Sequence, residues 1–345
     1  MIRIAVALVF AGVLATSPQQ ANAQQTKKVV ITTQGVEYLR ITPEEMAELA
    51  KADARVRLVT PAPERVAEEI ADADAIIGPA SAATLRAAKK LKWLQVTSAG
   101  VEGVLTPELK ARDVVVTNAK IIQGPEISDH ALAMLLALTR GLNTLIPARA
   151  NEEWRREGYP LTELRGRTAV VIGLGGIGTQ IAVRANAFGM KIIGVDPKDI
   201  PYMPFVEKTV TPERLDEVLP QADVVFIAAP HTAKSEKMFG PRQFGLMPKG
   251  GYFIAVSRGK VYDMPALVSA LETKQLAGAG VDVTDPEPLP KGHPLWKQEN
   301  VIITPHIAGR SDREHPRYIE LYKENLRRFA NGETLLNVVD KQSGY

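Results

Sequence analysis

Residues 168–189 read TAVVIGLGGIGTQIAVRANAFG, a short apolar run that leads through a glycine-rich loop into a predicted helix. Gly173, Gly175 and Gly178 stand in G-x-G-x-x-G spacing directly after the predicted strand. In such loops the first glycine permits a tight turn, the second lets the backbone approach a pyrophosphate, and the third allows close packing of helix on strand. The amides at the start of the helix then face the phosphates. The residues expected to bind a dinucleotide are therefore Gly173, Gly175, Gly176, Ile177 and Gly178.

The next predicted strand, KIIGVD at 191–196, ends in an acidic residue where an acceptor for the ribose hydroxyls is expected. Taken singly, an aspartate before a proline, as at Asp196, is more often a turn former. Beside the glycine loop it favours dinucleotide binding. Because a carboxylate repels a 2′-phosphate, NAD is the expected cofactor. NADP is the less favoured alternative, which Lys198 nearby keeps open.

Short β-rich runs alternate with helical stretches along the rest of the chain, a pattern typical of parallel sheets covered on both faces. The strands expected outside 168–196 are KVVITT (28–33), RVRLVT (55–60), DAIIG (74–78), LKWLQVT (91–97), DVVVTN (113–118), DVVFIAAP (223–230), GGYFIAVS (250–257), GAGVDV (278–283) and VIITPH (301–306). An apolar helix at 127–140 separates two cycles of this kind. The sequence therefore predicts an α/β fold with two parallel-sheet units, and a helical tail too short to fold alone.

The amino-acid composition excludes cysteine chemistry and gives no support to nucleic-acid binding. The 345 residues include no cysteine, which excludes disulfides, thiolate nucleophiles and cysteine-ligated metal sites. The formal charge of +3 is spread without a basic block, so nucleic-acid binding gains no support. No metal site is expected.

Residues 1–23 have the pattern of a secretory signal peptide. A single charge, Arg3, precedes the apolar run at 4–15, and Ala21-Asn22-Ala23 resembles a cleavage site. The run is too short for a permanent membrane anchor, since a spanning helix needs about 20 apolar residues. The expected location is therefore exported or periplasmic. A buried strand or a wrongly chosen start codon is the alternative, and the location is then cytoplasmic.

Four polar residues follow predicted strands, at the sheet edge where ligands bind in open α/β folds. Arg258, Asp282 and His306 end or follow the runs at 250–257, 278–283 and 301–306, and Glu287 lies in the loop after Asp282. Arginine supplies a fork of donors for a carboxylate, histidine can transfer a proton near neutral pH, and a neighbouring glutamate fixes the histidine tautomer. Each residue alone is compatible with a structural role. Together, beside a dinucleotide loop, they favour reduction of a 2-keto acid.

The chain resembles the D-isomer-specific 2-hydroxyacid dehydrogenase family over nearly the whole segment after residue 23. The motifs that carry the resemblance are SAGVEGV (98–104), EISDHALAMLLALTR (126–140), VIGLGGIG (171–178), VSRG (256–259), GVDVTDPEPLP (280–290) and TPHIAG (304–309). The resemblance implies catalysis by Arg258, Glu287 and His306, with Arg258 also binding substrate and cofactor. It implies that Asp282 contacts the nicotinamide side of the cofactor and that the amides of Gly100 and Val101 help to hold a carboxylate.

The resemblance also implies the domain organisation. Residues 24–121 and 308–345 would form a discontinuous substrate-binding domain around an NAD-binding Rossmann domain at 122–307, and the apolar helix would lie near a homodimer interface. The implied function is hydride transfer between NAD(H) and a small D-2-hydroxy or 2-keto acid of the glyoxylate/hydroxypyruvate type. Two alternatives are a dehydrogenase of another small anion, such as phosphite, and a dinucleotide-sensing protein that works by binding a partner.

Overall fold

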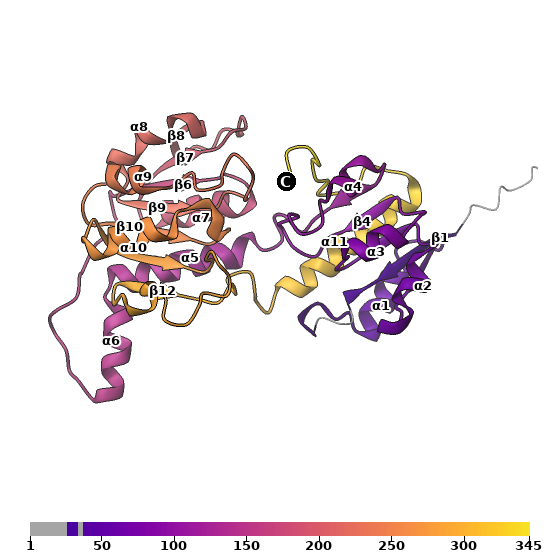
Figure 1. Cartoon of the computed structure of the whole chain (residues 1–345), viewed down its shortest axis with the longest axis horizontal. Coiled ribbons are helices and arrows are strands. Elements are labelled where there is room, and N and C mark those ends of the chain that lie inside the picture. Colours follow the sequence, from indigo (N-terminus) through magenta and orange to yellow (C-terminus); the bar gives the residue numbers. More distant parts are fainter. Residues whose placement is uncertain (1–25, 34–36) are drawn as a thin grey trace, which may run out of the picture.

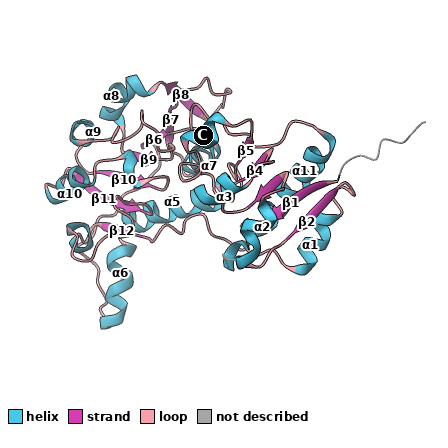
Figure 2. Cartoon of the chain, turned by 45° about the vertical axis from the view of Figure 1, so that its right-hand side comes forward, coloured by secondary structure: helices cyan, strands magenta, loops and turns pink. Residues whose placement is uncertain are grey.

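The structure is a computed structural model that describes residues 26–33 and 37–345. The expected signal peptide at 1–23 lies outside the described residues. The chain forms two α/β domains, each built on its own parallel sheet (Figures 1 and 2). The prediction of two parallel-sheet units is confirmed.

The first domain holds a five-stranded sheet in the order β2-β1-β3-β4-β5. Its strands and helices are β1 (Lys27–Ile31), α1 (Pro43–Ala50), β2 (Val56–Val59), α2 (Val66–Ile70), β3 (Ala75–Ile77), α3 (Ala82–Ala87), β4 (Trp93–Gln95), α4 (Pro107–Ala111) and β5 (Val115–Thr117). β3 is apolar and buried throughout, as expected of a strand covered on both faces. A capping box between Thr42 and Glu45 starts α1, with Pro43 at the first helical position.

The second domain holds a seven-stranded sheet in the order β12-β11-β10-β9-β6-β7-β8. Its strands are β6 (Thr168–Ile172), β7 (Lys191–Val195), β8 (Val206–Val210), β9 (Val224–Ile227), β10 (Gly251–Ala255), β11 (Leu276–Val281) and β12 (Val301–Ile303). Its helices are α5 (Gly124–Thr139), α6 (Leu142–Ala148), α7 (Gly176–Ala187), α8 (Leu215–Val218), α9 (Pro241–Leu246) and α10 (Met264–Glu272). The order of the strands reverses between β6 and β9, which is where this fold places its ligand crevice.

The sequence did not predict β8 as a strand. Three of its five residues are exposed, at the open edge of the sheet. Its sequence, VEKTV, lacks the apolar run by which the buried strands were predicted. The segment η3 (Pro63–Arg65) runs into α2, where a helix from about Pro63 is expected. The other 3-10 segments were not predicted: η2 (Glu37–Leu39), η4 (Arg149–Asn151), η5 (Pro212–Arg214), η6 (Leu219–Gln221), η7 (Gly259–Val261) and η8 (Pro294–Lys297).

The tail returns to the first domain as α11 (Glu314–Asn331). Tyr318, Leu321 and Leu326 join the apolar core of the first sheet. Asn325 is fully buried and donates to Gln95 at the end of β4, while its oxygen accepts from the amide of Leu336. The first domain is therefore discontinuous and is completed by the tail, as predicted.

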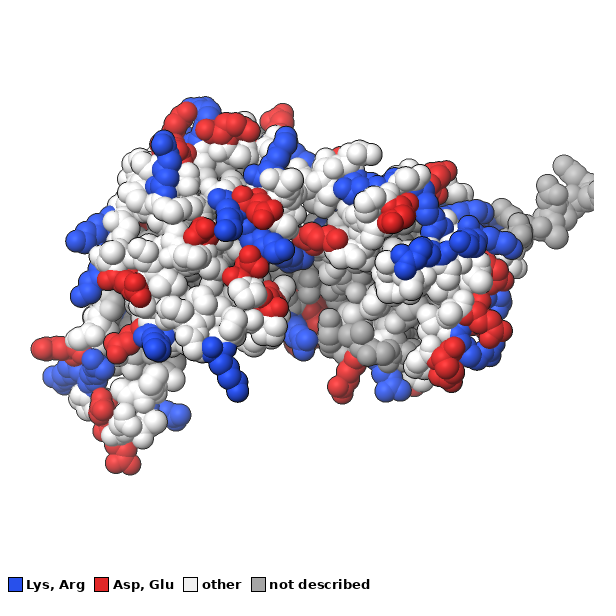
Figure 3. All heavy atoms as spheres, viewed as in Figure 1, with Lys and Arg blue, Asp and Glu red and all other residues white. Residues whose placement is uncertain are grey.

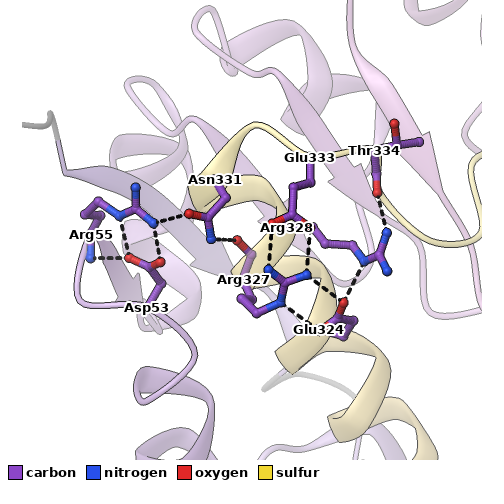
Figure 4. Close-up of polar contacts among 8 residues, drawn as sticks. All are labelled: Asp53, Arg55, Glu324, Arg327, Arg328, Asn331, Glu333 and Thr334. Atoms are coloured by element: carbon purple, nitrogen blue, oxygen red, sulfur yellow. Dashed lines mark hydrogen bonds and ion pairs between the residues drawn. The ribbon is translucent and has the colours of Figure 1, made fainter.

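Charged side chains fasten the far end of α11 (Figure 4). Arg327 bridges Glu324 and Glu333, and Arg328 contacts Glu324 at 2.7 Å. The nearby guanidinium of Arg55 pairs with Asp53 and donates to Asn331 at 2.6 Å. These contacts connect the end of α11 to the loop before β2.

The two connections between the domains lie side by side. Gln123 at the first connection donates to the carbonyl of Gly309 at the second, at 3.1 Å. Arg317 of α11 reaches back to the carbonyl of Ile122 and to Glu126, both at 2.7 Å. The domain boundaries expected at 121/122 and 307/308 fall in these connections and stay predictions.

On the face shown in Figure 3, basic and acidic side chains are interspersed over both domains.

Within the described residues, no single helix has the length and apolar character to cross a bilayer. Only α5 taken with Leu142–Asn151, a pair bent by 74°, meets that criterion.

We expect the contribution of the charged cluster of Figure 4 to stability to depend on pH. Hydrogen bonds from Arg327 and Arg328 lower the pKa of Glu324 to about 2, and Arg55 lowers that of Asp53 to about 2. Both values lie below the unfolded-state values of about 4, so this stabilisation is present above pH 4 and is lost as the pH falls towards 2. We expect Arg327→Gln to lower the urea midpoint at pH 7, with a smaller deficit at pH 2.5.

Arg86→Gln, at an exposed position of α3, is the matched control and should leave the midpoint unchanged at both pH values. An Arg327→Gln deficit that is equally large at pH 2.5 would contradict the assignment.

Candidate functional site

The three glycines of the G-x-G-x-x-G pattern at 173–178 have different structural roles. Gly173 adopts φ +91°, and a Cβ there would lie 2.7 Å from the Cα of Ala229. A Cβ on Gly178 would lie 1.7 Å from the carbonyl oxygen of Gly173, so only glycine lets α7 pack this closely on its strand. Gly175 caps α7, and a Cβ there would meet no heavy atom within 4 Å. The open side of Gly175 is where a pyrophosphate can approach the backbone.

The loop also packs against the connection between the domains. A Cβ on Gly176 would lie 2.9 Å from the Cα of Ile121, and one on Gly124 would lie 2.9 Å from the carbonyl oxygen of Gly176. Ile177 packs on the core of the second domain. The start of α7 is thereby held directly beneath the first connection.

Asp196 follows β7 and faces the glycine loop. One carboxylate oxygen accepts from the amide of Leu174 at 2.8 Å, and the other accepts from the amide of Lys198 at 2.9 Å. The ammonium of Lys198 lies 4.1 Å from the ring centre of Tyr345, in the tail of the first domain. Burial raises the pKa of Tyr345, and the charges of Asp196 and Asp340 add to the shift. The expected ribose acceptor thus lies beside a cation and an aromatic ring.

The polar residues after β10, β11 and β12 meet at one edge of the second sheet. The strands are adjacent and parallel, so their carboxyl ends coincide. Hydrogen bonds continue past the strand ends, since the amide of Asp282 donates to Ala255 and that of His306 donates to Asp282, each at 2.9 Å. These backbone hydrogen bonds therefore place His306 next to Asp282, where the neighbouring strands β11 and β12 end.

His306 and Glu287 form a close pair. Nδ1 of His306 lies 2.6 Å from Oε1 of Glu287, and 42% of each side chain is exposed. The backbone of His306 has φ +53°, an uncommon conformation for a residue other than glycine, and such strain clusters at functional sites. Beneath the loop of Glu287, the hydroxyl of Tyr262 donates to Val283 at 2.6 Å. Burial raises the pKa of Tyr262, with Glu287 contributing next.

Asp282 is buried and fixes the loop that carries His306. Its carboxylate accepts from the hydroxyl of Thr304 at 2.6 Å and from the amides of Ile307 and Ala308 at 3.0 Å. His130 of α5 hydrogen-bonds to the same hydroxyl at 2.9 Å. The expected contact of Asp282 with the nicotinamide side stays a prediction, whereas its contacts here position the segment 304–308.

Arg258 reaches across to the first domain. Its Nη1 donates to the carbonyl of Ser257 at 2.8 Å, and its Nε lies 3.3 Å from Oε1 of Glu102. A Cβ on Gly100 would lie 1.8 Å from Nη2, so Gly100 and Arg258 are in direct contact. Val101, next in the loop, is buried in the core of the first domain. The structure thus brings together Arg258 and the loop expected to hold a carboxylate.

Glu102 was not predicted as a site residue. The motif SAGVEGV was interpreted only for its backbone amides, although the acidic residue within it was the available signal. Its partner across the domain gap could not be found from the sequence because 156 positions, Glu102 to Arg258, separate the two residues.

Two buried polar atoms at the same edge have no hydrogen-bond partner among the described residues: Nε2 of His231, after β9, and Oγ of Ser257, after β10. His231 lies 3.6 Å from Glu236, too far for a hydrogen bond. Buried polar atoms are normally satisfied, so the site fits a ligand that supplies partners. Over the part of the chain that is described, no three His, Asp or Glu side chains come close enough to hold a metal ion.

These features define a two-domain α/β protein with a pyridine-nucleotide-binding domain. The family model for the D-isomer specific 2-hydroxyacid dehydrogenase, NAD binding domain, matches residues 132–308. The chain belongs to the D-isomer specific 2-hydroxyacid dehydrogenase family. This family of oxidoreductases acts on small 2-hydroxy and 2-keto acids.

Known relatives cover most of the chain. A glyoxylate reductase of Korarchaeum cryptofilum is 32% identical, covering 82% of this chain and 87% of that protein. The crystal structure of a D-isomer specific 2-hydroxyacid dehydrogenase family protein from Aeromonas salmonicida is 28% identical, with a TM-score of 0.77, covering 92% of this chain and 100% of that one. An NADPH-dependent glyoxylate/hydroxypyruvate reductase of Sinorhizobium meliloti, in complex with NADP and sulfate, is 25% identical with the same TM-score and coverage.

Two alanine substitutions separate the roles of the loop glycines. Gly178→Ala forces its Cβ against a carbonyl oxygen, and we expect a loss of about 1–3 kcal/mol in the free energy of unfolding. Gly175→Ala meets no protein atom, so stability should be retained while dinucleotide affinity falls at least about 10-fold, because the methyl group blocks the approach of the pyrophosphate. Urea unfolding and NADH fluorescence titration measure the two effects.

Gly245→Ala in α9 is the matched control, since a Cβ there also meets no atom within 4 Å. It should leave dinucleotide affinity unchanged. Unaltered NADH binding by Gly175→Ala would show that the pyrophosphate lies elsewhere.

Proposed function

We propose that the protein is an NAD-dependent oxidoreductase that transfers hydride between NAD(H) and a small D-2-hydroxy or 2-keto acid of the glyoxylate/hydroxypyruvate type. The observation that carries the proposal is the His306–Glu287 pair at the same sheet edge as Arg258. The side chains that would act as the anchor, the proton donor and the orienting carboxylate thus share the edge at which the glycine loop opens. The relation to the glyoxylate reductase of Korarchaeum cryptofilum supports the substrate class.

The residues of the second domain fit the dinucleotide. The amides at the start of α7 and the open side of Gly175 would hold the pyrophosphate, and Asp196 would accept from the ribose hydroxyls. Bound there, the cofactor supplies the hydride. A carboxylate at 196 favours NAD over NADP, because the 2′-phosphate would be repelled by it.

Arg258 would bind the substrate carboxylate and polarise the neighbouring carbonyl, because its planar fork of donors matches a carboxylate. The contact of Gly100 with Nη2 of Arg258 sets the carboxylate-binding loop next to this fork. His306 would donate a proton to the carbonyl oxygen from Nε2, since Glu287 engages Nδ1. Glu287 would hold the ring orientation and stabilise the protonated imidazole.

Hydroxyacid turnover tests the proposal directly. With purified protein that lacks residues 1–23, we expect NADH to be oxidised in the presence of glyoxylate or hydroxypyruvate, with NADPH a poorer cofactor. In the same assay, His306→Asn should lower kcat at least about 100-fold, because acid–base assistance typically contributes 100- to 10,000-fold. Asparagine is chosen because it tolerates the left-handed backbone of position 306.

The control is His293→Asn, where the side chain caps a short helical turn and asparagine can replace it. It should turn over normally, and NADH affinity should be unchanged in both variants. Near-normal turnover by His306→Asn would remove the acid–base assignment. NADH binding without turnover on any of a panel of 2-keto acids would favour a dinucleotide sensor instead.

We further propose that two copies assemble through the arm formed by α6 and the chain up to residue 161. The arm projects from the second domain (Figure 1), and four of its large apolar side chains are exposed: Leu142, Ile146, Trp154 and Leu161. Exposed apolar patches of this kind mark association surfaces.

Sedimentation velocity of the parent protein should give twice the chain mass, and the Ile146→Asp variant should sediment as a monomer. A monomeric parent protein would contradict the proposal, and Tyr202→Ala, exposed outside the arm, should leave the mass unchanged.

We also propose that the protein is exported, on the basis of the pattern at 1–23. Export places the protein where free NAD is scarce, so either the cofactor arrives tightly held or catalysis is not the role of the exported protein. Sequencing the N-terminus of protein from its native host tests this. A start at Gln24 would support export, and a start at Met1 would overturn it.

A further inference from the structure

The ion pair between Glu102 and Arg258 crosses from one domain to the other. Glu102 belongs to the loop after β4, whereas Arg258 follows β10, and their Oε1 and Nε atoms lie 3.3 Å apart. About one third of each side chain is exposed, so the pair is accessible to a small anion. A Cβ on Gly100 would lie 2.5 Å from the second oxygen of Glu102 and 1.8 Å from Nη2 of Arg258. A carboxylate, a guanidinium and a glycine backbone thus converge at one point.

The N–H groups of the Arg258 guanidinium face two different sets of acceptors. Nη1 donates to the carbonyl of Ser257, a contact within the second domain. The side formed by Nε and Nη2 is left for a bidentate carboxylate, and Glu102 faces it. Glu102 therefore lies against the donors that a substrate carboxylate needs.

We propose that Glu102 is an internal competitor for the substrate carboxylate and so sets the affinity and charge preference of the site. This inference rests on the proposed function, in which Arg258 is the carboxylate anchor. A 2-keto acid binds by displacing the carboxylate of Glu102 from Nε of Arg258, and a second negative charge on the substrate meets added repulsion from the displaced group. The site consequently favours monoanions over dianions.

A positioning role for Glu102 predicts the opposite behaviour. If its carboxylate orients the guanidinium, removing the charge misplaces Arg258 and raises KM or lowers kcat. A competitor that is removed lowers KM and leaves kcat unchanged. The direction of the change in KM therefore separates the two roles.

Glu102→Gln removes the charge and keeps the size of the side chain. We expect KM for glyoxylate to fall about 3- to 10-fold with kcat within about 2-fold of the parent value. The fall for oxaloacetate, a dianion, should be larger. Glu64→Gln, at an exposed position of η3, is the matched control and should change neither constant. A KM that is unchanged or raised in Glu102→Gln would overturn the inference.

Binding of oxamate, an unreactive carboxylate, to the NADH-loaded protein gives a readout that does not depend on turnover. Fluorescence titration should show tighter oxamate binding by Glu102→Gln than by the parent, in the same ratio as the KM values. If turnover is normal and both proteins bind oxamate with equal affinity, Glu102 does not compete with the substrate carboxylate, whereas the proposed function still holds. Absence of both turnover and oxamate binding in the parent and the variant would defeat both.

Discussion

The carboxylate of Asp282 is the constraint on which the candidate site depends. It is buried, and it holds a side-chain hydroxyl and two backbone amides of the segment 304–308. A buried carboxylate is costly unless its hydrogen bonds are satisfied, so these donors hold the segment in one conformation. The same segment carries His306 and begins the return to the first domain. One acceptor thus fixes both the candidate acid and the second connection between the domains.

The site is assembled from two domains whose movements are restricted by neighbouring connections. Gln123 joins the two connections directly, and the start of α7 packs beneath the first of them. Both connections between the domains therefore lie next to the glycine loop. Glu102 and Arg258 meet across the gap between the domains, so any change in that gap alters the surroundings of the proposed carboxylate anchor.

The sequence predicted the two parallel sheets because most of their strands are buried and apolar. It predicted the glycine loop because the G-x-G-x-x-G spacing directly follows such a strand. It missed β8, whose exposed residues do not form an apolar run. The pairing of His306 with Glu287 could be expected from their positions after neighbouring strands. The contact of Glu102 with Arg258 could not, because it depends on how two separately folded domains face each other. Likewise, the bonds of Asp282 to the 304–308 segment depend on loop conformations that residue type does not determine.

The position of α11 in the chain affects the order in which the domains can form during synthesis. The first sheet is translated early, yet its core is completed by Tyr318, Leu321 and Leu326. Until that helix has been synthesised, the apolar face of the sheet stays uncovered. β5 ends at Thr117 and α11 ends at Asn331, so just over two hundred further residues are needed. At about 5–20 residues per second this takes roughly 10 to 40 seconds. The second domain is continuous and can close its core within that interval. The nascent chain thus passes through an incomplete state in which the first sheet lacks part of its apolar cover.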